Sequence, residues 1–188
     1  MEKLIILTGY SRCGKDSTAK GLKEIYEKEG KTVDIFNFSW VLKKILAKIL
    51  DISINQLDEI KNKDITYATR YFTLNMRSLL KRTADVFREL RGDSFFAQQV
   101  MDLINSSDAD ICIITDMRFR VEYDTIKSNY DRYLIVRVDR EHPDCRSRKG
   151  DEEVDAIPYD IKFTKKANPH KMEWLKNEID KKYESWLV

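Results

Sequence analysis

The sequence predicts an α/β fold with a mostly parallel sheet and helices on both of its faces. Short apolar runs alternate along the chain with stretches in which apolar residues recur at helical spacing. The apolar runs are continuous, which is typical of strands buried on two faces. Parallel neighbours need crossover connections, and the helical stretches between the runs provide them. In such sheets, ligands bind beyond the carboxyl ends of the strands.

The N-terminal part of the chain predicts a strand, a loop and a helix in direct succession. Residues 3–8 contain the apolar run 4–7, and we expect them to form a buried strand. After the loop, apolar residues recur at helical spacing between Ala19 and Tyr26, and Gly30 provides a C-terminal stop.

The later elements follow from the same periodicities. Gly92 ends a long helix whose apolar positions begin at Met76, and Ser53 with Gln56 resembles a capping box. The segment 55–73 is polar and predicts no definite element. The other expected elements are a strand at 32–38, helices at about 41–50 and 94–104, strands at 111–114 and 133–138, a short strand near Ile161, and a final helix from Asn168-Pro169 through Trp186.

Length and composition favour a single domain without a large nucleic-acid-binding surface. The chain has 188 residues, too few to make two ordinary domains the expected arrangement. Its 34 basic and 32 acidic residues leave a formal charge of +2, which gives no large field for nucleic acid. The apolar run at 4–7 is too short for a signal peptide or a membrane span, so we expect a cytoplasmic protein. The sequence leaves a homodimer open.

The cysteine and histidine residues give no metal or disulfide pattern. Cys13, Cys112 and Cys145 are odd in number and widely spaced, so we expect neither a disulfide framework nor a Cys-x-x-Cys knuckle. We interpret Cys13 as a small loop residue. Only His142 and His170 occur, without the spacing of a zinc site, so a metal ion is expected to arrive with a phosphate ligand.

The loop after the first strand matches the Walker A pattern. Two glycines, Gly9 and Gly14, lie five positions apart and Lys15 follows, between the predicted strand and helix that the motif requires. Backbone amides in such a loop converge on phosphate oxygens, and the helix N-terminus adds partial positive charge. The loop therefore predicts a three-layer P-loop NTPase fold that binds ATP. The residues expected to hold ATP here are Gly9, Ser11, Arg12, Cys13, Gly14, Lys15, Asp16, Ser17 and Thr18.

Asp16 departs from the usual Walker A pattern, in which Ser or Thr follows the lysine and binds Mg²⁺. A carboxylate is also a hard oxygen ligand, so Asp16, or Ser17 beside it, is a candidate ligand for Mg²⁺ that arrives with the phosphates. The alternative is that Asp16 only stabilises the first helical turn.

A second strand end predicts a Walker B element. The apolar run at 111–114 leads to Asp116, which we expect beside the phosphate loop. Arg118 and Glu122 follow, four positions apart; they are either a substrate clamp or a surface ion pair, and we favour the clamp for Arg118. Lys15, Asp16, Asp116 and Arg118 are the candidate catalytic residues.

Phosphoryl transfer between nucleotides requires several cations, because donor and acceptor phosphates repel each other. Arginine is well suited to bind phosphate. No Ser-His-Asp or Cys-His set is evident, which fits an acceptor phosphate that is already ionised. The candidate arginines are Arg77, Arg88, Arg118, Arg140, Arg146 and Arg148, the last three in or beside the charged segment 141–155.

Four segments together carry a resemblance to a known family. They are Gly9 to Ser17 with Gly-Lys-Asp-Ser, Phe38-Ser-Trp-Val-Leu-Lys43, Arg77-Ser-Leu-Leu-Lys-Arg-Thr-Ala-Asp-Val-Phe-Arg88, and Thr115-Asp-Met-Arg-Phe-Arg-Val-Glu122. Over most of its length the chain resembles the deoxynucleoside monophosphate kinase family of bacteriophages and bacteria.

The resemblance implies a kinase with two added parts on a core of residues 1–39, 106–140 and 156–188. A helical insert at 40–105 would bind the acceptor nucleoside monophosphate, and a short lid at 141–155 would close over ATP. The implied acceptor-binding residues are Lys43, Arg77, Arg88, Asp116, Arg118 and Glu122, and Arg146 and Arg148 would lie in the lid.

Two alternatives remain. Phosphomevalonate kinases of the animal type and dephospho-coenzyme A kinases share parts of this pattern, so the chain could be another small-molecule kinase. It could also be a regulatory protein that binds a nucleotide without turnover.

Overall fold

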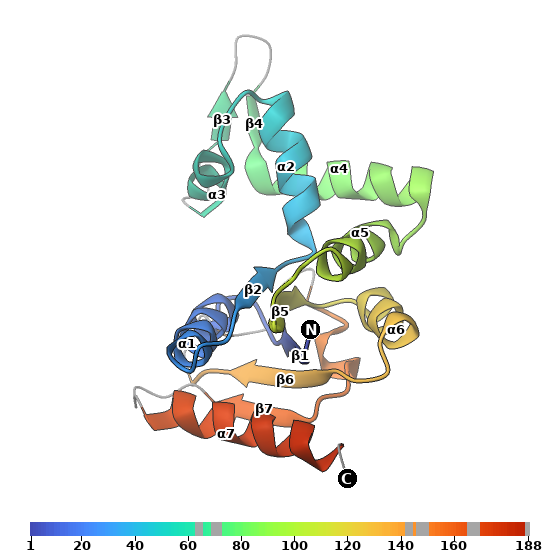
Figure 1. The fold of residues 1–188 in the computed structure, drawn as a ribbon. Coiled ribbons are helices and arrows are strands. Elements are labelled where there is room, and N and C mark those ends of the chain that lie inside the picture. The colour runs from blue at the N-terminus through green and yellow to red at the C-terminus, as the bar shows by residue number, and fades with distance from the viewer. Residues whose placement is uncertain (63–65, 69–72, 142–144, 146–150, 165–169, 187–188) are drawn as a thin grey trace. The chain divides into compact units, whose positions relative to one another are not determined.

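A five-stranded parallel sheet is the main feature of the computed structural model, which describes residues 1–62, 66–68, 73–141, 145, 151–164 and 170–186 (Figure 1). The strand order is β2-β5-β1-β6-β7, and every neighbouring pair is parallel. The strands are β1 (Lys3–Thr8), β2 (Val33–Phe36), β5 (Ile111–Met117), β6 (Leu134–Asp139) and β7 (Ile161–Thr164).

The central strands are buried on both faces, as their continuous apolar sequences predict. In β5 all residues from Ile111 to Thr115 are buried, and in β1 all from Leu4 to Thr8 are buried. Successive side chains of a strand point to opposite faces, so a fully buried run requires cover on both. The structure confirms the predicted α/β class.

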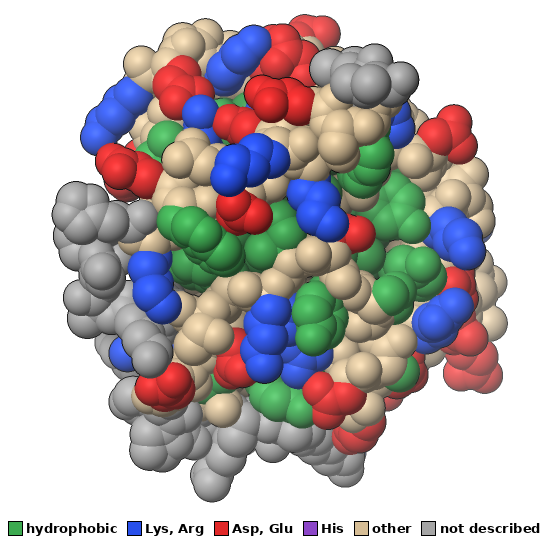
Figure 2. All heavy atoms as spheres, turned by 90° about the horizontal axis from the view of Figure 1, so that it is seen from below, with side chains coloured by type: hydrophobic (Ala, Val, Ile, Leu, Met, Phe, Trp, Pro, Cys, Tyr) green, Lys and Arg blue, Asp and Glu red, His purple; other side chains and the backbone are tan. Residues whose placement is uncertain are grey.

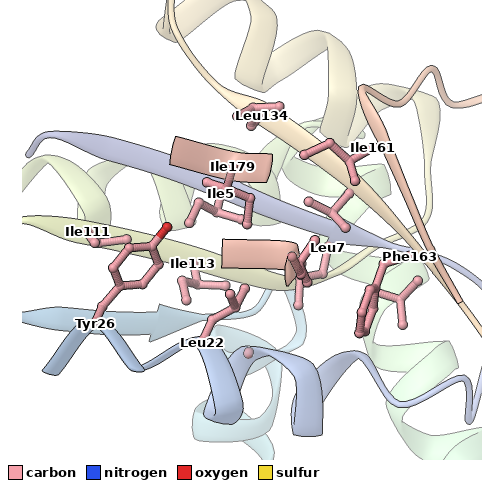
Figure 3. Packing of buried hydrophobic residues seen from close by; sticks show 14 of the residues in the cluster. Ile5, Leu7, Leu22, Tyr26, Ile111, Ile113, Leu134, Ile161, Phe163 and Ile179 are labelled. Atoms are coloured by element: carbon pink, nitrogen blue, oxygen red, sulfur yellow. The ribbon is translucent and has the colours of Figure 1, made fainter. Parts of the chain in front are cut away.

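One face of the sheet packs against helices α1 (Lys15–Lys28) and α7 (His170–Ser185). Figure 3 shows Ile5 and Leu7 of β1 in the same cluster as Leu22 of α1 and Ile179 of α7. Leu4 and Ile6 point to the opposite face and are also buried. In Figure 1, α6 (Arg120–Asn129) lies across the sheet from α1.

The chain divides into two compact units, one of residues 1–37 with 101–188 and one of residues 38–100. The second unit has its own apolar cluster, which includes Leu42, Leu57, Met76 and Phe96. The unit of residues 38–100 contains α2 (Ser39–Ile49), α3 (Ile54–Asn62), β3 (Thr66–Ala68), β4 (Thr73–Asn75), α4 (Met76–Arg91) and the first part of α5 (Phe95–Asn105).

Capping residues mark the ends of α4 and the start of α3, and of these the sequence analysis predicted Gly92 and the Ser53–Gln56 pair. The Asn75 side chain accepts hydrogen bonds from the backbone at the start of α4, and Gly92 ends that helix. Ser53 and Gln56 form the expected reciprocal capping hydrogen bonds. The antiparallel pair β3 and β4 was not predicted, because strands of three residues are too short to show a periodic pattern. The predicted helix start at Asn168-Pro169 lies outside the described residues.

Charged side chains of both signs are interspersed on the face shown in Figure 2. This distribution agrees with the small net charge of the chain. Among the described residues, no helix combines the length and the apolar character that a membrane crossing requires.

Gly9 follows β1 and permits no side chain. Its φ is +139°, and a Cβ at this position would lie 2.3 Å from the Val138 carbonyl oxygen. We predict that Gly9→Ala lowers the free energy of unfolding by about 3 kcal/mol or more, through backbone strain and collision. Urea denaturation measures the loss.

Gly30→Ala is the matched control for this substitution. Gly30 also has a positive φ, of +81°, but nothing lies within 4 Å of its Cβ position. Its expected loss is only about 1–2 kcal/mol, from conformation alone. Equal losses in the two variants would contradict the role assigned to the contact with Val138.

Candidate functional site

The loop between β1 and α1 has the curled backbone that its glycines predict. Arg12 and Gly14 have left-handed φ values of 64° and 94°. The Thr18 amide donates to the Gly14 carbonyl at 2.9 Å, which begins the hydrogen-bond pattern of α1. The amides of the first helical turn lack intrahelical acceptors and give this end of α1 partial positive charge. This end of the loop is therefore suited to an anion.

Lys15 lies over the start of the loop. Its Nζ donates hydrogen bonds to the carbonyls of Gly9 at 2.7 Å and Tyr10 at 2.8 Å, and the residue is 6% exposed. Burial, together with the nearby Arg118 guanidinium, lowers the pKa of Lys15 to about 8. The carboxylates of Asp151, Asp116 and Asp16 act in the opposite direction.

The carboxyl end of β5 lies beside that of β1. The Thr8 hydroxyl donates to the Met117 carbonyl at 3.0 Å, which joins the two strand ends. Asp116 is close enough to Lys15 to affect its pKa. The structure thus brings the predicted Walker B aspartate into the electrostatic surroundings of the predicted Walker A lysine.

Glu122 is buried at the start of α6, with 7% of its surface exposed. Its Oε2 accepts the backbone N–H of Arg118 at 2.7 Å and of Phe119 at 3.0 Å. Burial raises the pKa of Glu122 to about 8, Asp116 adds to the shift, and the two backbone donors oppose it. The alternative of a surface ion pair between Arg118 and Glu122 is wrong, because Glu122 is buried and binds backbone.

The Arg118 guanidinium reaches back to the phosphate loop. Its Nη1 lies 3.4 Å from the Ser11 hydroxyl oxygen and 3.4 Å from Asp151 Oδ1. The Asp151 carboxylate also accepts the Ser11 backbone N–H at 3.0 Å and its hydroxyl at 3.3 Å. Ser11, Arg118 and Asp151, from three distant parts of the sequence, therefore form one hydrogen-bonded group.

The candidate metal ligands lie on the first turn of α1. Asp16 and Ser17 are exposed, and the Ser17 hydroxyl donates to the Gly14 carbonyl at 2.9 Å. A hydroxyl that donates its proton still has oxygen lone pairs for a cation. The Thr18 hydroxyl also donates to Gly14, at 3.0 Å, and is buried. Carboxylate and hydroxyl oxygens are the donor types that Mg²⁺ binds, so the residues present fit this ion.

Cys13 and Cys145 form a disulfide with a Cα–Cα distance of 4.6 Å. The expectation of no disulfide, with Cys13 as a plain loop residue, is therefore wrong. Their sequence separation of 132 conceals the pairing, which arises because the segment after β6 returns to the loop. Asp139 lies nearby, with Oδ1 3.7 Å from Cys145 Sγ, and among the described residues these three form the group with metal-ligand spacing. Bonding between the two sulfur atoms removes both thiolates as ligands.

Three predicted acceptor-binding residues lie in the unit of residues 38–100. Lys43 forms a salt bridge with Asp58 at 2.9 Å, and Arg88 forms one with Asp85 at 3.3 Å. Arg77 is exposed on α4. Arg140 is exposed directly after β6, and Arg146 and Arg148 lie outside the described residues.

The sequence analysis missed one connection and one site residue. Tyr10 of the loop donates to Asp155, and Arg137 lies over the Tyr10 ring at 4.8 Å while it binds Asp155 at 2.8 Å.

Asp151 was treated only as part of the lid. No local signal distinguishes it from its acidic neighbours, because its importance comes from burial against Ser11.

Comparison with known proteins gives a family match. A family model described as phosphomevalonate kinase matches residues 7–132. No curated protein matches the chain. Among solved structures, a shikimate kinase from Aquifex aeolicus is 16% identical with a TM-score of 0.48, over 95% of this chain and 97% of that one. An APS kinase from Mycobacterium tuberculosis in complex with AMPPNP and APS is 14% identical with a TM-score of 0.47, over 95% and 97%.

The disulfide predicts a stability that depends on reductant. A cross-link that closes a loop of this length stabilises a protein by up to about 5 kcal/mol, because it restricts the unfolded chain. We expect a reducing agent to lower the urea midpoint, and thiol titration of the unreduced, denatured protein to detect Cys112 alone. Cys145→Ser removes the reductant effect and Cys112→Ser keeps it. Identical midpoints of the original protein with and without reductant would show that the cross-link is absent.

The lowered pKa of Lys15 predicts that ATP binding depends on pH. Below pH 8 the ammonium is charged and attracts phosphate, and above pH 8 it becomes neutral. Affinity should therefore be level near pH 7 and fall above pH 8, by at most about tenfold per pH unit. Titration with a fluorescent ATP analogue between pH 7 and 9.5 measures this. In Lys15→Arg the guanidinium stays charged, so the fall should disappear; an equal fall in both proteins would assign it to another group.

Proposed function

Because the chain belongs to the phosphomevalonate kinase family, we propose that it is a kinase that transfers the γ-phosphoryl group of ATP to the phosphate of a small monoester. The first candidate acceptor is a deoxynucleoside or ribonucleoside monophosphate, which becomes the diphosphate. The observation that carries the proposal is the loop at Gly9–Lys15 between β1 and α1, with Asp116 and Arg118 at the adjoining strand end.

The proposed donor site uses the loop backbone and Lys15. In this structure the Lys15 ammonium binds the carbonyls of Gly9 and Tyr10, so it is already held inside the loop. Phosphate oxygens would take over part of this hydrogen bonding while the loop amides from Ser11 to Asp16 surround them. The cations then balance the charge that develops on the transferred group.

Asp16 and Ser17 would hold Mg²⁺ together with the ATP phosphates. When bound, this ion would supply positive charge that offsets the negative charge of the phosphate oxygens. Without a cation the exposed Asp16 would repel ATP, because like charges near the same helix end oppose each other. This repulsion supports a divalent ion at the first turn of α1.

The acceptor is proposed to lie near Arg118. An acceptor phosphate is already ionised, so the transfer needs no strong general base, and Arg118 can orient the phosphate with paired N–H donors. Lys43, Arg77, Arg88 and Glu122 are proposed to complete the acceptor site by the resemblance described above. The segment 141–155, with Arg140, Arg146 and Arg148, is proposed to be the lid that covers ATP and excludes water. Cys145, Asp151 and Asp155 of this segment are already held against the phosphate loop.

Phosphomevalonate is the second candidate acceptor, because the family model carries that description. It too is a phosphate monoester, so the same donor site and the same Arg118 serve it. Dephospho-coenzyme A differs, since transfer to its hydroxyl requires a base, for which Asp116 is the candidate. A regulatory protein would bind ATP without acceptor-dependent release of ADP.

A coupled ADP-release assay tests the proposal. The acceptors are the deoxynucleoside and ribonucleoside monophosphates, phosphomevalonate and dephospho-coenzyme A. Stimulation by one or more nucleoside monophosphates supports the first candidate, and stimulation by phosphomevalonate alone supports the second. The kinase proposal fails if no acceptor stimulates turnover.

Two variants connect that activity to the site. Lys15→Ala should lower turnover by about 100-fold or more, as for loss of a preorganised charge in a phosphate site. Arg118→Ala should raise the acceptor KM by about tenfold or more, with a smaller change in the KM for ATP. The matched control is Arg120→Ala, whose side chain binds Asp124 on α6. Unchanged kinetics in Arg118→Ala would remove Arg118 from the site.

A further inference from the structure

Asp151 is a buried acid at the junction of two parts of the candidate site. The residue is 2% exposed. Its carboxylate accepts two hydrogen bonds from Ser11, one from the backbone N–H, and lies 3.4 Å from Arg118 Nη1. A buried carboxylate is unfavourable unless it is hydrogen-bonded and paired with a positive charge. For Asp151, Ser11 donates the hydrogen bonds and Arg118 provides the charge, and both residues belong to the candidate site.

The backbone around Asp151 is fixed by its own contacts. The Val154 amide donates to the Asp151 carbonyl at 3.2 Å, and Val154 is fully buried at the start of a short 3-10 helix, Val154–Ala156. The Arg137 side chain, which comes from β6, binds the Val154 carbonyl at 2.7 Å. The carboxylate of Asp151 is therefore attached to the sheet, so its position does not depend on Arg118 alone.

Arg118 is the more exposed partner in this contact. Its side chain is 35% exposed, whereas that of Asp151 is 1% exposed. A long arginine side chain loses substantial rotamer freedom when it binds a ligand, and a partner that holds it beforehand reduces that loss. A guanidinium has five N–H donors, so Nη1 can remain with Asp151 while other donors meet a phosphate.

We propose that Asp151 is a positioning residue that holds the Arg118 guanidinium against Ser11 of the phosphate loop, in the orientation from which it binds the acceptor phosphate. The proposal rests on the proposed function, because it assigns acceptor binding to Arg118. Asp151 itself touches neither substrate. It links the loop that would carry the donor phosphates to the arginine that would carry the acceptor phosphate.

Asp151→Asn tests the proposal with little change in shape. The amide oxygen still accepts the Ser11 N–H, but the negative charge that holds Arg118 is lost. We expect the acceptor KM to rise about fivefold or more, as for the loss of coupling between contacting charged residues, with kcat and the KM for ATP changed less than about twofold. The matched control is Asp155→Asn. Asp155 binds Tyr10 of the same loop and Arg137, but not Arg118, and its side chain is 67% exposed.

A double-mutant cycle distinguishes positioning from general support of the fold. If Asp151 acts through Arg118, then Asp151→Asn causes no further rise in the acceptor KM when Arg118 is already Ala. A further rise of the same size in the Arg118→Ala background would overturn the proposal. So would an equal effect on the two KM values, or an equal effect of Asp155→Asn.

A spectroscopic measurement keeps the test independent of activity. In the protein without ligands, the Arg118 Nε–H signal in an ¹⁵N NMR spectrum, assigned by its loss in Arg118→Lys, should report a more ordered side chain than that of the exposed Arg120. Asp151→Asn should lower the order parameter of Arg118 and leave that of Arg120 unchanged. An unchanged order parameter would overturn the positioning role, whereas failure of every acceptor in the ADP-release assay would overturn only the kinase proposal.

Discussion

The close approach of Gly9 to the main chain of β6 is the constraint on which the candidate site depends. A Cβ on residue 9 would lie 2.3 Å from the Val138 carbonyl oxygen, so only glycine allows β1 to leave the sheet at this point. The chain then turns at once into the loop, and Lys15 at its far end reaches back to the Gly9 carbonyl. The loop amides, the Lys15 ammonium and the N-terminus of α1 therefore lie close together, and their positive charges attract the same anion.

The buried charged residues of the site depend on one another for their partners and their pKa values. Lys15, Glu122 and Asp151 are all buried, and each has its partners among the other groups of the site or the nearby backbone. Burial lowers the pKa of Lys15, the Arg118 guanidinium lowers it as well, and the carboxylates of Asp151 and Asp116 oppose the shift, so a change in one group alters its neighbours. Substitutions in such a network are not additive, which is why a double-mutant cycle is informative here.

Local patterns predicted the elements of the fold well, because each is encoded by adjacent residues. Continuous apolar runs identified β1 and β5, and Gly92 marked the end of α4 as capping rules require. Contacts between distant residues were missed. The disulfide between Cys13 and Cys145 joins positions 132 apart, and no sequence spacing indicates such a pair. The family named by the matching model is one of the alternatives that the sequence patterns left open, and the choice of acceptor remains a proposal.

The sequence by itself determined the class of fold and the presence of a glycine-bounded loop with Lys15 between a strand and a helix. These depend on periodicity and on short motifs, which act over a few residues. Only the tertiary structure decided that Glu122 binds backbone, that Asp151 lies between Ser11 and Arg118, and that Cys13 is cross-linked. The reason is physical: burial and pairing depend on which strand ends lie side by side in the sheet, and that order is set by packing of the whole chain.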